Sequence, residues 1–239
     1  MSSMRRVTGR DRRIRPVTNS YAATDPRKYG TPAWWHKSDA GITLNVSKVV
    51  TWADQSGNSV DVTQAVDATR PTYSASGGPN SYPSLRFSNQ SLNLALGSPL
   101  LTTDWTVVLV CRATTAGSTS GTFLRHGHVA NNTGLDIVSS VLTRRVTCKG
   151  VANHDDSTLT ADTWEIMAVS RANGAAPLMW VNNASQVLTN AASTGYNTGA
   201  NILDYGVAVN VCELAEVIAY NTVIDTTALV TALRTKYAI

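Results

Sequence analysis

The chain has 239 residues, of which 43% are hydrophobic and 15% are charged. A domain of this size buries enough apolar surface to fold without disulfide or metal staples, and all-β domains often run this long as one unit. No apolar run approaches the roughly 18 residues of a membrane span, and the basic N-terminus lacks the apolar stretch of a signal peptide. We therefore expect a protein that is made in the cytoplasm and has no membrane partner.

Positive charge is concentrated at the N-terminal end. Residues 1–30 carry eight basic and two acidic side chains, a balance of +6, whereas residues 31–239 carry 12 basic and 14 acidic ones, a balance of −2. The first segment shows no hydrophobic periodicity, so it cannot bury enough surface to become ordered alone. We predict an extended arm over 1–30 that anchors the chain to a partner, and a folded domain over 31–239. The anchoring residues of this arm are Arg5, Arg6, Arg10, Arg12, Arg13, Arg15, Arg27 and Lys28.

Short strands separated by turn signals fill the folded domain in chain order. The run 46–53 leads into Asp-Gln-Ser-Gly-Asn, a dense turn signal, and the segments 84–87 and 91–96 alternate apolar with polar residues. Residues 105–111 are apolar at both odd and even positions, which predicts a central strand covered on both faces. Further strands are predicted at 121–126, 135–139, 141–148, 164–170, 178–181 with 186–188 as a hairpin, and 205–220.

One helix is signalled, at the C-terminal end. Asp225 is a good N-cap, and apolar residues recur at 228, 229, 232, 233 and 237 with helical spacing. Lys236 falls in the last turn, where positive charge suits the helix dipole. About a dozen strands and one terminal helix predict a β-sandwich, because a parallel α/β sheet would need alternating helices.

Five segments resemble one family of domains. They are Ala33–Asp39 (AWWHKSD), Val49–Asn58 (VVTWADQSGN), Arg70–Tyr73 (RPTY), Tyr82–Phe87 (YPSLRF) and Glu213–Asn221 (ELAEVIAYN). In this order they are similar to the opening, the W-x-D-x-S-G-N turn, two internal strands and the close of concanavalin A-like, laminin G-like domains. The resemblance implies a jelly-roll β-sandwich over residues 33–239. It implies no single function, because such domains occur in adhesins, glycan-active enzymes and tailed-phage virions.

The motif residues are expected to be structural. Asp54 can close an Asx turn, Gly57 can take a positive φ, and Trp52 can cover the end of the core. His36 and Lys37 stand where the family has a Leu-Asp pair. We therefore expect no role that depends on an acid at position 37.

The carboxylates argue against glycoside hydrolysis, which needs two carboxyl groups about 5–10 Å apart. The chain has three glutamates, Glu165, Glu213 and Glu216, and none belongs to the E-x-D-x-E strand pattern of jelly-roll glucanases. Glu213 and Glu216 are three positions apart, so in a regular strand they face opposite sides of the sheet. We expect no catalytic residues and keep a glycoside hydrolase only as an alternative.

Two clusters are candidate ligand sites. The segment 126–128 places two histidines on one side of a strand, but no third ligand is identifiable, and we expect a solvated loop edge rather than a metal site. Asn153, Asp155 and Asp156 offer the oxygen ligands that Ca²⁺ prefers, and with Trp35 they form the candidate glycan site. We expect no cofactor, with Ca²⁺ as the alternative, and most tryptophans are expected in the core.

These observations favour a non-enzymatic structural protein of a tailed-bacteriophage virion, because a virion carries such a fold outside cells without a secretion signal. The arm would attach the chain to the major capsid protein or a tail protein, as in a capsid decoration (cement) protein. We expect the copies to form a homo-oligomer on a symmetric lattice, and we expect no nucleic-acid partner because the arm lacks interleaved aromatic residues. The alternatives are a tail-associated virion component and a carbohydrate-binding module.

Overall fold

The computed structural model describes residues 21–96, 100–101, 103–114, 121–128, 133–140, 143–149, 152–156, 160–188, 202–206 and 211–239. The strands in this part of the chain are β1 (Pro32–Lys37), β2 (Ile42–Asn45), β3 (Lys48–Trp52), β4 (Val62–Thr63), β5 (Thr72–Ser74), β6 (Ser84–Phe87), β7 (Leu92–Ala95), β8 (Trp105–Ala113), β9 (Gly121–His128), β10 (Thr133–Ser140), β11 (Thr143–Lys149), β12 (Ala152–Asp156), β13 (Glu165–Arg171), β14 (Leu178–Val181), β15 (Ala184–Gln186), β16 (Ile202–Tyr205) and β17 (Cys212–Tyr220). The helices are the 3-10 turns η1 (Pro26–Lys28), η2 (Asp67–Thr69) and η3 (Pro79–Ser81), and the α-helix α1 (Thr226–Tyr237).

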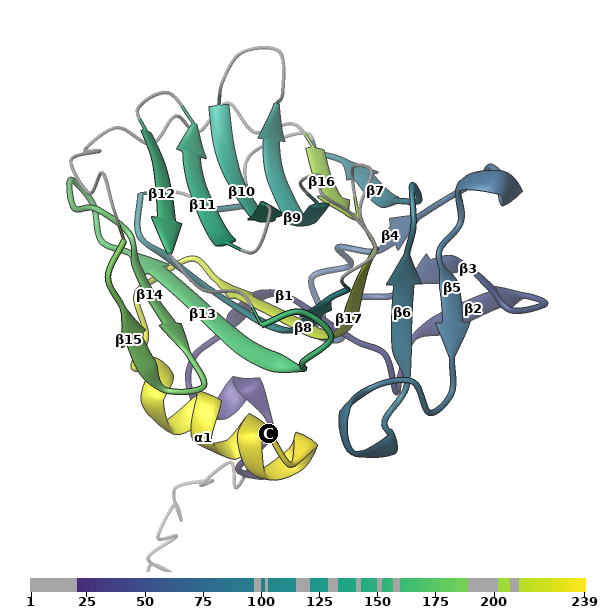
Figure 1. Cartoon of the computed structure of the whole chain (residues 1–239), viewed down its shortest axis with the longest axis horizontal. Coiled ribbons are helices and arrows are strands. Elements are labelled where there is room, and N and C mark those ends of the chain that lie inside the picture. The colour runs from purple at the N-terminus through teal and green to yellow at the C-terminus, as the bar shows by residue number, and fades with distance from the viewer. Residues whose placement is uncertain are drawn as a thin grey trace, which may run out of the picture.

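The strands form one antiparallel hydrogen-bonded network that folds into two layers (Figure 1). The first layer has the order β12-β11-β10-β9-β16-β7. The second has the order β15-β14-β13-β8-β17, with β6 and then β1 along the other edge of β17. The short strands β4, β3 and β5 connect the layers at one side. The predicted all-β sandwich with one C-terminal helix is confirmed.

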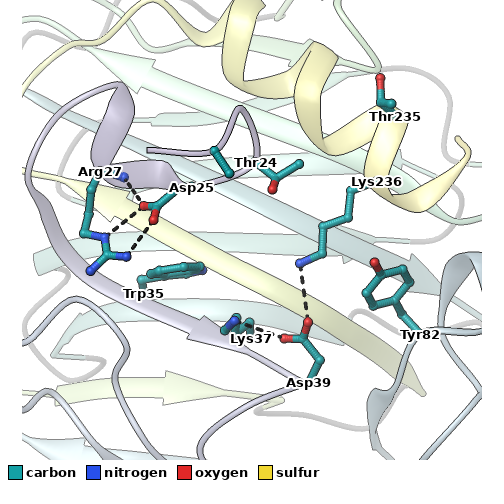
Figure 2. A pocket seen from close by; sticks show the side chains of 10 residues that line it. Thr24, Asp25, Arg27, Trp35, Lys37, Asp39, Tyr82, Thr235 and Lys236 are labelled. Atoms are coloured by element: carbon teal, nitrogen blue, oxygen red, sulfur yellow. Dashed lines mark hydrogen bonds and ion pairs between the residues drawn. The ribbon is translucent and has the colours of Figure 1, made fainter. Parts of the chain in front are cut away.

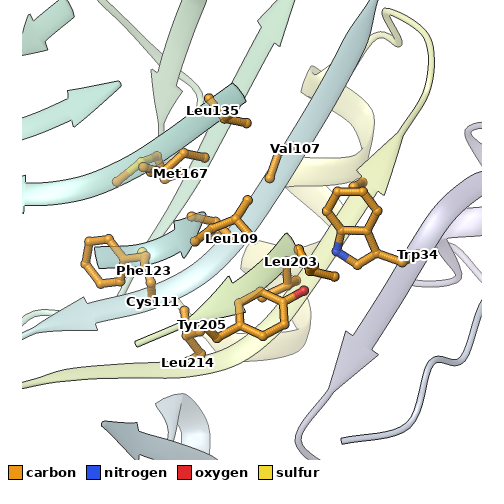
Figure 3. Packing of buried hydrophobic residues seen from close by; sticks show 14 of the residues in the cluster. Trp34, Val107, Leu109, Cys111, Phe123, Leu135, Met167, Leu203, Tyr205 and Leu214 are labelled. Atoms are coloured by element: carbon orange, nitrogen blue, oxygen red, sulfur yellow. The ribbon is translucent and has the colours of Figure 1, made fainter. Parts of the chain in front are cut away.

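Large apolar side chains from both layers fill the space between them (Figure 3). Strand alternation decides which side chains enter this core. In β8, Leu109 points inward, whereas Val108 and Val110 face the opposite side of the sheet and pack in one cluster with Leu229 and Leu233 of α1. The predicted central strand, covered on both faces, is therefore confirmed.

The helix α1 has the predicted cap. A side-chain oxygen of Asp225 accepts the backbone N–H of Thr227 at 2.9 Å, and Ala238 ends the helix in the left-handed conformation at φ 52°. The apolar face of the helix covers the outer face of the second layer, which we call the outer face from here on. Among the described residues, no helix is long and apolar enough to span a bilayer.

The carboxylate of Asp54 ties the loop after β3 to β1. It accepts the backbone N–H groups of Trp35 at 2.8 Å, Ser56 at 2.9 Å and Asn58 at 3.1 Å, and the Ser56 hydroxyl at 2.6 Å. Burial alone would raise the pKa of Asp54, but these hydrogen bonds to its ionised form outweigh burial and lower the pKa. Gly57 follows with a φ of 96°. The structural roles predicted for Asp54 and Gly57 are confirmed.

His36 occupies the core with both ring nitrogens satisfied. Its Nε2 lies 2.9 Å from the carbonyl oxygen of Val60, which can only accept, so Nε2 carries the proton. Its Nδ1 therefore accepts the hydroxyl hydrogen of Tyr205 at 3.0 Å. Burial is the main cause that lowers the pKa of His36 to about 4, so the ring is neutral at pH 7.

His126 is buried as well. Its Nε2 accepts the backbone N–H groups of Leu100 at 3.1 Å and Leu101 at 3.4 Å, and burial lowers its pKa to about 4. The predicted solvated loop edge is therefore wrong for His126, because the strand β9 carries the ring into the core beside Trp34. The side chain of His128 lies outside the described part of the structure.

Candidate functional site

A pocket of about 490 Å³ opens on the outer face, between the N-terminal segment and the end of α1 (Figure 2). Its lining combines two aromatic rings with five charged side chains. The lining residues are Ala22, Thr24, Asp25, Arg27, Trp35, Lys37, Asp39, Tyr82, Thr235 and Lys236.

Trp35 forms the base of the pocket. Residues of β1 alternate between the two faces, so Trp34 and His36 enter the core while Trp35 and Lys37 face outward. Only 7% of Trp35 is exposed. The guanidinium carbon of Arg27 lies 5.8 Å from its ring centroid and Nζ of Lys37 lies 5.2 Å from it. The indole therefore has two cations within cation–π distance.

Glu216 lies beneath the pocket and fixes its base. Its Oε1 accepts the indole N–H of Trp35 at 2.6 Å. Its Oε2 accepts the Tyr237 hydroxyl at 2.8 Å and the Lys236 ammonium group at 2.9 Å. Burial, and then the charge of Glu216, raises the pKa of Tyr237 far above its usual range, so this hydroxyl stays a donor. The carboxylate is fully buried and holds three donors from β1 and α1 in place.

One wall of the pocket is the N-terminal segment. Asp25 caps η1 and accepts hydrogen bonds from the backbone N–H of Arg27 at 3.0 Å and from its guanidinium at 2.9 and 2.6 Å. The guanidinium bond is the main cause that lowers the pKa of Asp25. The buried carbonyl of Pro26 accepts the Tyr220 hydroxyl at 2.9 Å, and Tyr29 donates to the carbonyl of Ala23 at 2.7 Å. Residues 23–29 are therefore packed on the outer face.

The opposite wall consists of Asp39, Tyr82 and the last turn of α1 (Figure 2). Asp39 lies 3.7 Å from Nζ of Lys37 and 3.8 Å from Nζ of Lys236. Nζ of Lys236 also lies 5.3 Å from the ring centroid of Tyr82, which meets Tyr237 edge to face. Each charged group of this wall thus lies within ion-pair distance of a partner.

The predicted anchoring residues fall in two groups. Arg27 and Lys28 lie in η1, and Arg27 lines the pocket. Arg5, Arg6, Arg10, Arg12, Arg13 and Arg15 lie outside the described residues. The anchoring role of the arm therefore stays a prediction.

The structure separates the residues of the predicted glycan site. Trp35 belongs to β1 and faces the pocket, whereas Asn153, Asp155 and Asp156 belong to β12 in the first layer. The side chains on β12 lie outside the described part of the structure. Trp35 is therefore the one member of that set at the pocket, and the role of the other three stays a prediction.

The pocket residues that sequence reasoning missed come from the first 82 residues and from the last turn of α1. Lys236 was assigned to the helix dipole, and Asp39 and Tyr82 were assigned only to family motifs. The only local signal for Lys37 is that it replaces the family's usual acid. Their convergence needs the pairing of β1 with β17, which brings residue 37 beside residue 216.

A β-bulge overturns the predicted placement of the two nearby glutamates. The pairing of β17 with β8 shifts register between Leu214 and Glu216, so one extra residue is inserted there. The prediction that Glu213 and Glu216 face opposite sides is therefore wrong, and both lie on the outer face. Each has its own partners, since Glu213 pairs with arginines of β6 and β8.

Comparison with known proteins gives the fold. No family model matches the chain, and no curated protein is similar enough in sequence to match. The botulinum neurotoxin type G receptor-binding domain superposes with a TM-score of 0.63 at 7% identity, over 86% of this chain and 51% of that chain. The serotype D binding domain gives 0.63 at 8% identity, over 91% and 52%. Trypanosoma rangeli sialidase gives 0.57 at 9% identity, over 85% and 32%.

This chain therefore spans about half the length of the toxin binding domains and about a third of the sialidase. At identities below 10% these likenesses show a shared β-sandwich fold. The activities of those proteins belong to longer chains, of which the matched region is only a part. The function of this chain is therefore argued from its own site.

Proposed function

We propose that this chain is a non-catalytic carbohydrate-binding domain whose ligand enters the pocket above Trp35. The observation that carries the proposal is the pocket's combination of an aromatic base with charged side chains held in fixed positions. Trp35 is hydrogen-bonded to Glu216 and Asp25 to Arg27. Asp39 lies within ion-pair distance of two lysines.

A saccharide fits this combination of groups. A sugar ring presents C–H groups on its faces and hydroxyls around its rim, so it is bound by aromatic surface together with fixed donors and acceptors. Tyr82 is partly exposed and offers most of the aromatic surface, whereas Trp35, with 7% exposed, forms the base. Asp25 and Asp39 offer acceptors and Lys236 a donor, and hydrogen bonds to charged groups are the strong ones.

Structures of the same fold support the ligand class. One is described as a botulinum neurotoxin serotype D ligand-binding domain in complex with N-acetylneuraminic acid, at a TM-score of 0.59 and 7% identity. Another is a Trypanosoma rangeli sialidase in complex with the inhibitor DANA. These ligands belong to those proteins, and they support a saccharide here only as a class.

The state of the glutamates supports binding without cleavage. A general acid and a nucleophile or base must both reach the scissile bond. Glu216 is fully buried under Trp35, and Glu213 is engaged by two arginines. The two acids that line the pocket, Asp25 and Asp39, are paired with cations.

A glycan array with the purified chain tests the proposal, followed by titration calorimetry on the best ligand. Lys37→Gln and Asp39→Asn change partly exposed pocket groups without touching the core. We expect each to weaken binding by about tenfold, which corresponds to one charge-assisted hydrogen bond. The matched control is Lys48→Gln, which removes a lysine of β3 that pairs with Asp67 of η2, and it should bind like the parent chain.

The proposal fails if no saccharide binds, or if the pocket variants and Lys48→Gln bind equally well. Release of reducing ends from the bound glycan would overturn the non-catalytic part alone. The virion role remains a prediction that depends on the arm over residues 1–30. Deletion of residues 1–20, which leaves the pocket residues Asp25 and Arg27 in place, with a test of virion incorporation addresses it separately.

A further inference from the structure

A row of charged side chains crosses the outer face beside the pocket. Arg86 of β6, Glu213 of β17 and Arg112 of β8 are direct register partners across three neighbouring strands. Glu213 is almost fully buried, whereas half of the Arg86 side chain and a quarter of the Arg112 side chain are exposed. We call these three residues the arginine row.

The carboxylate of Glu213 orients both guanidinium groups. Nη1 of Arg86 donates to its Oε1 at 3.2 Å, and Nη2 of Arg112 donates to its Oε2 at 2.6 Å. The guanidinium of Arg112 also lies 5.0 Å from the ring centroid of Trp164. The two arginines are thus pre-organised by a shared acid and an aromatic face.

The row has unused capacity to bind an anion. Its net charge is +1, because two arginines share one carboxylate. Each guanidinium has five N–H donors, and Glu213 accepts a hydrogen bond from one nitrogen of each. The donors open to a ligand belong to the exposed parts of the two side chains, because Nε of Arg112 is buried. A fixed arginine fork with spare donors suits a carboxylate or sulfate.

The row and the pocket lie on the same face. The β8 partners of Glu213 and Glu216 are only two residues apart, which places Glu213 about 7 Å along the sheet from the acid beneath the pocket. The bulge at this point puts both side chains on the outer face. The pocket and the arginine row therefore lie on the same side of the second layer.

We infer that the arginine row is a subsite for the acidic group of a charged saccharide, whose neighbouring unit occupies the pocket. This inference rests on the proposed carbohydrate-binding function. The row selects acidic saccharides over neutral ones, because a neutral unit cannot pair with the two guanidinium groups.

Matched pairs of probes test the subsite. Polygalacturonate is compared with its methyl ester, and chondroitin sulfate with its desulfated form, by titration at low and high salt. We expect the parent chain to bind at least one acidic form about tenfold more tightly than its neutral counterpart, and this preference to shrink as salt rises. Arg86→Gln should abolish the preference, and Arg112→Lys should reduce it because lysine lacks the planar fork. Lys48→Gln should retain it.

The outcomes separate the two proposals. Neutral saccharides that bind as well as their acidic forms overturn the subsite and leave the carbohydrate-binding function standing. An acidic preference that survives Arg86→Gln also overturns it. Poly-L-glutamate that binds as tightly as the acidic saccharides would show a site for acidic chains in general and overturn the saccharide assignment. Absence of binding by every saccharide overturns both proposals. Thermal unfolding of each variant confirms that the chain is folded.

Discussion

The indole N–H of Trp35 donates a 2.6 Å hydrogen bond to the buried carboxylate of Glu216, and this bond joins β1 to β17 under the pocket. The same carboxylate accepts from Lys236 at 2.9 Å and from Tyr237 at 2.8 Å. The N-terminal strand β1 therefore meets the two last elements of the chain, β17 and α1, at one charge. The shape of the pocket depends on that charge being compensated.

Removal of the Lys236 ammonium group should destabilise the fold. Lys236→Met leaves Glu216 buried without its counter-ion, and the loss of one partner of a buried pair costs about 3 kcal/mol or more. Urea unfolding followed by tryptophan fluorescence measures the change. The double variant Glu216→Gln, Lys236→Met buries no charge and should be more stable than Lys236→Met alone. If the double variant is less stable than both single variants, the pair does not act as described.

Removal of the Asp54 carboxylate should destabilise the fold as much as removal of the Lys236 ammonium group. Asp54→Ala leaves the backbone N–H groups of Trp35 and Ser56 without their acceptor, and we expect a loss of roughly 3 kcal/mol in the free energy of unfolding. The control is Asp67→Ala, which removes an exposed acid that pairs with Lys48 and Arg70 and should change stability little. Similar effects of the two substitutions in urea unfolding would contradict the structural role of Asp54.

Most of the fold follows from local patterns in the sequence. Alternation in β6 and β7, and the apolar run of β8, follow from which faces of each strand are covered. The helix α1 follows from its spacing and from Asp225. These signals lie within single elements, so one sequence is sufficient to predict them.

The site could not be predicted in the same way. The bulge between Leu214 and Glu216 inserts a single residue, and no residue type marks it, yet it reverses the face on which Glu216 lies. Lys37 and Lys236 meet at Asp39 only because β1 and α1 pack beside the same strand. Burial of His126 likewise depends on packing of the two layers, which a local pattern does not contain.

Gly206 should tolerate no side chain. Its φ is 76°, and a Cβ atom there would meet the ring of Phe87. Gly206→Ala therefore combines a left-handed backbone with overpacking of the core, and we expect a loss of about 3 kcal/mol or more. Gly174 has a φ of 72° with nothing within 4 Å of the added atom, so Gly174→Ala isolates the backbone penalty of about 1 kcal/mol. Equal melting temperatures for the two variants would refute the packing argument.

Stability should decrease as the pH falls below 6.5. His36 and His126 have a pKa of about 4 in the folded chain, against about 6.5 when unfolded. Between these values the unfolded chain binds more protons, so the free energy of unfolding decreases as the pH falls, by about 3 kcal/mol for each histidine. Asp204 acts in the opposite sense, because burial raises its pKa to about 6 and the folded chain binds its proton first. Its contribution to the free energy of unfolding offsets roughly that of one of the two histidines.

Urea midpoints between pH 7 and pH 4.5 measure this net loss. The variant His36→Phe, Tyr205→Phe removes one titrating ring together with the hydroxyl that donates to it. Neither polar group of that hydrogen bond is then left buried without its partner. With His36 gone, the opposing contributions of His126 and Asp204 nearly cancel, and the midpoint of this variant should change little over the same range. A parent chain whose midpoint is constant from pH 7 to pH 4.5 would show that the two rings are not held neutral in the core. A variant that loses stability as steeply as the parent would show that His36 is not one of the groups responsible.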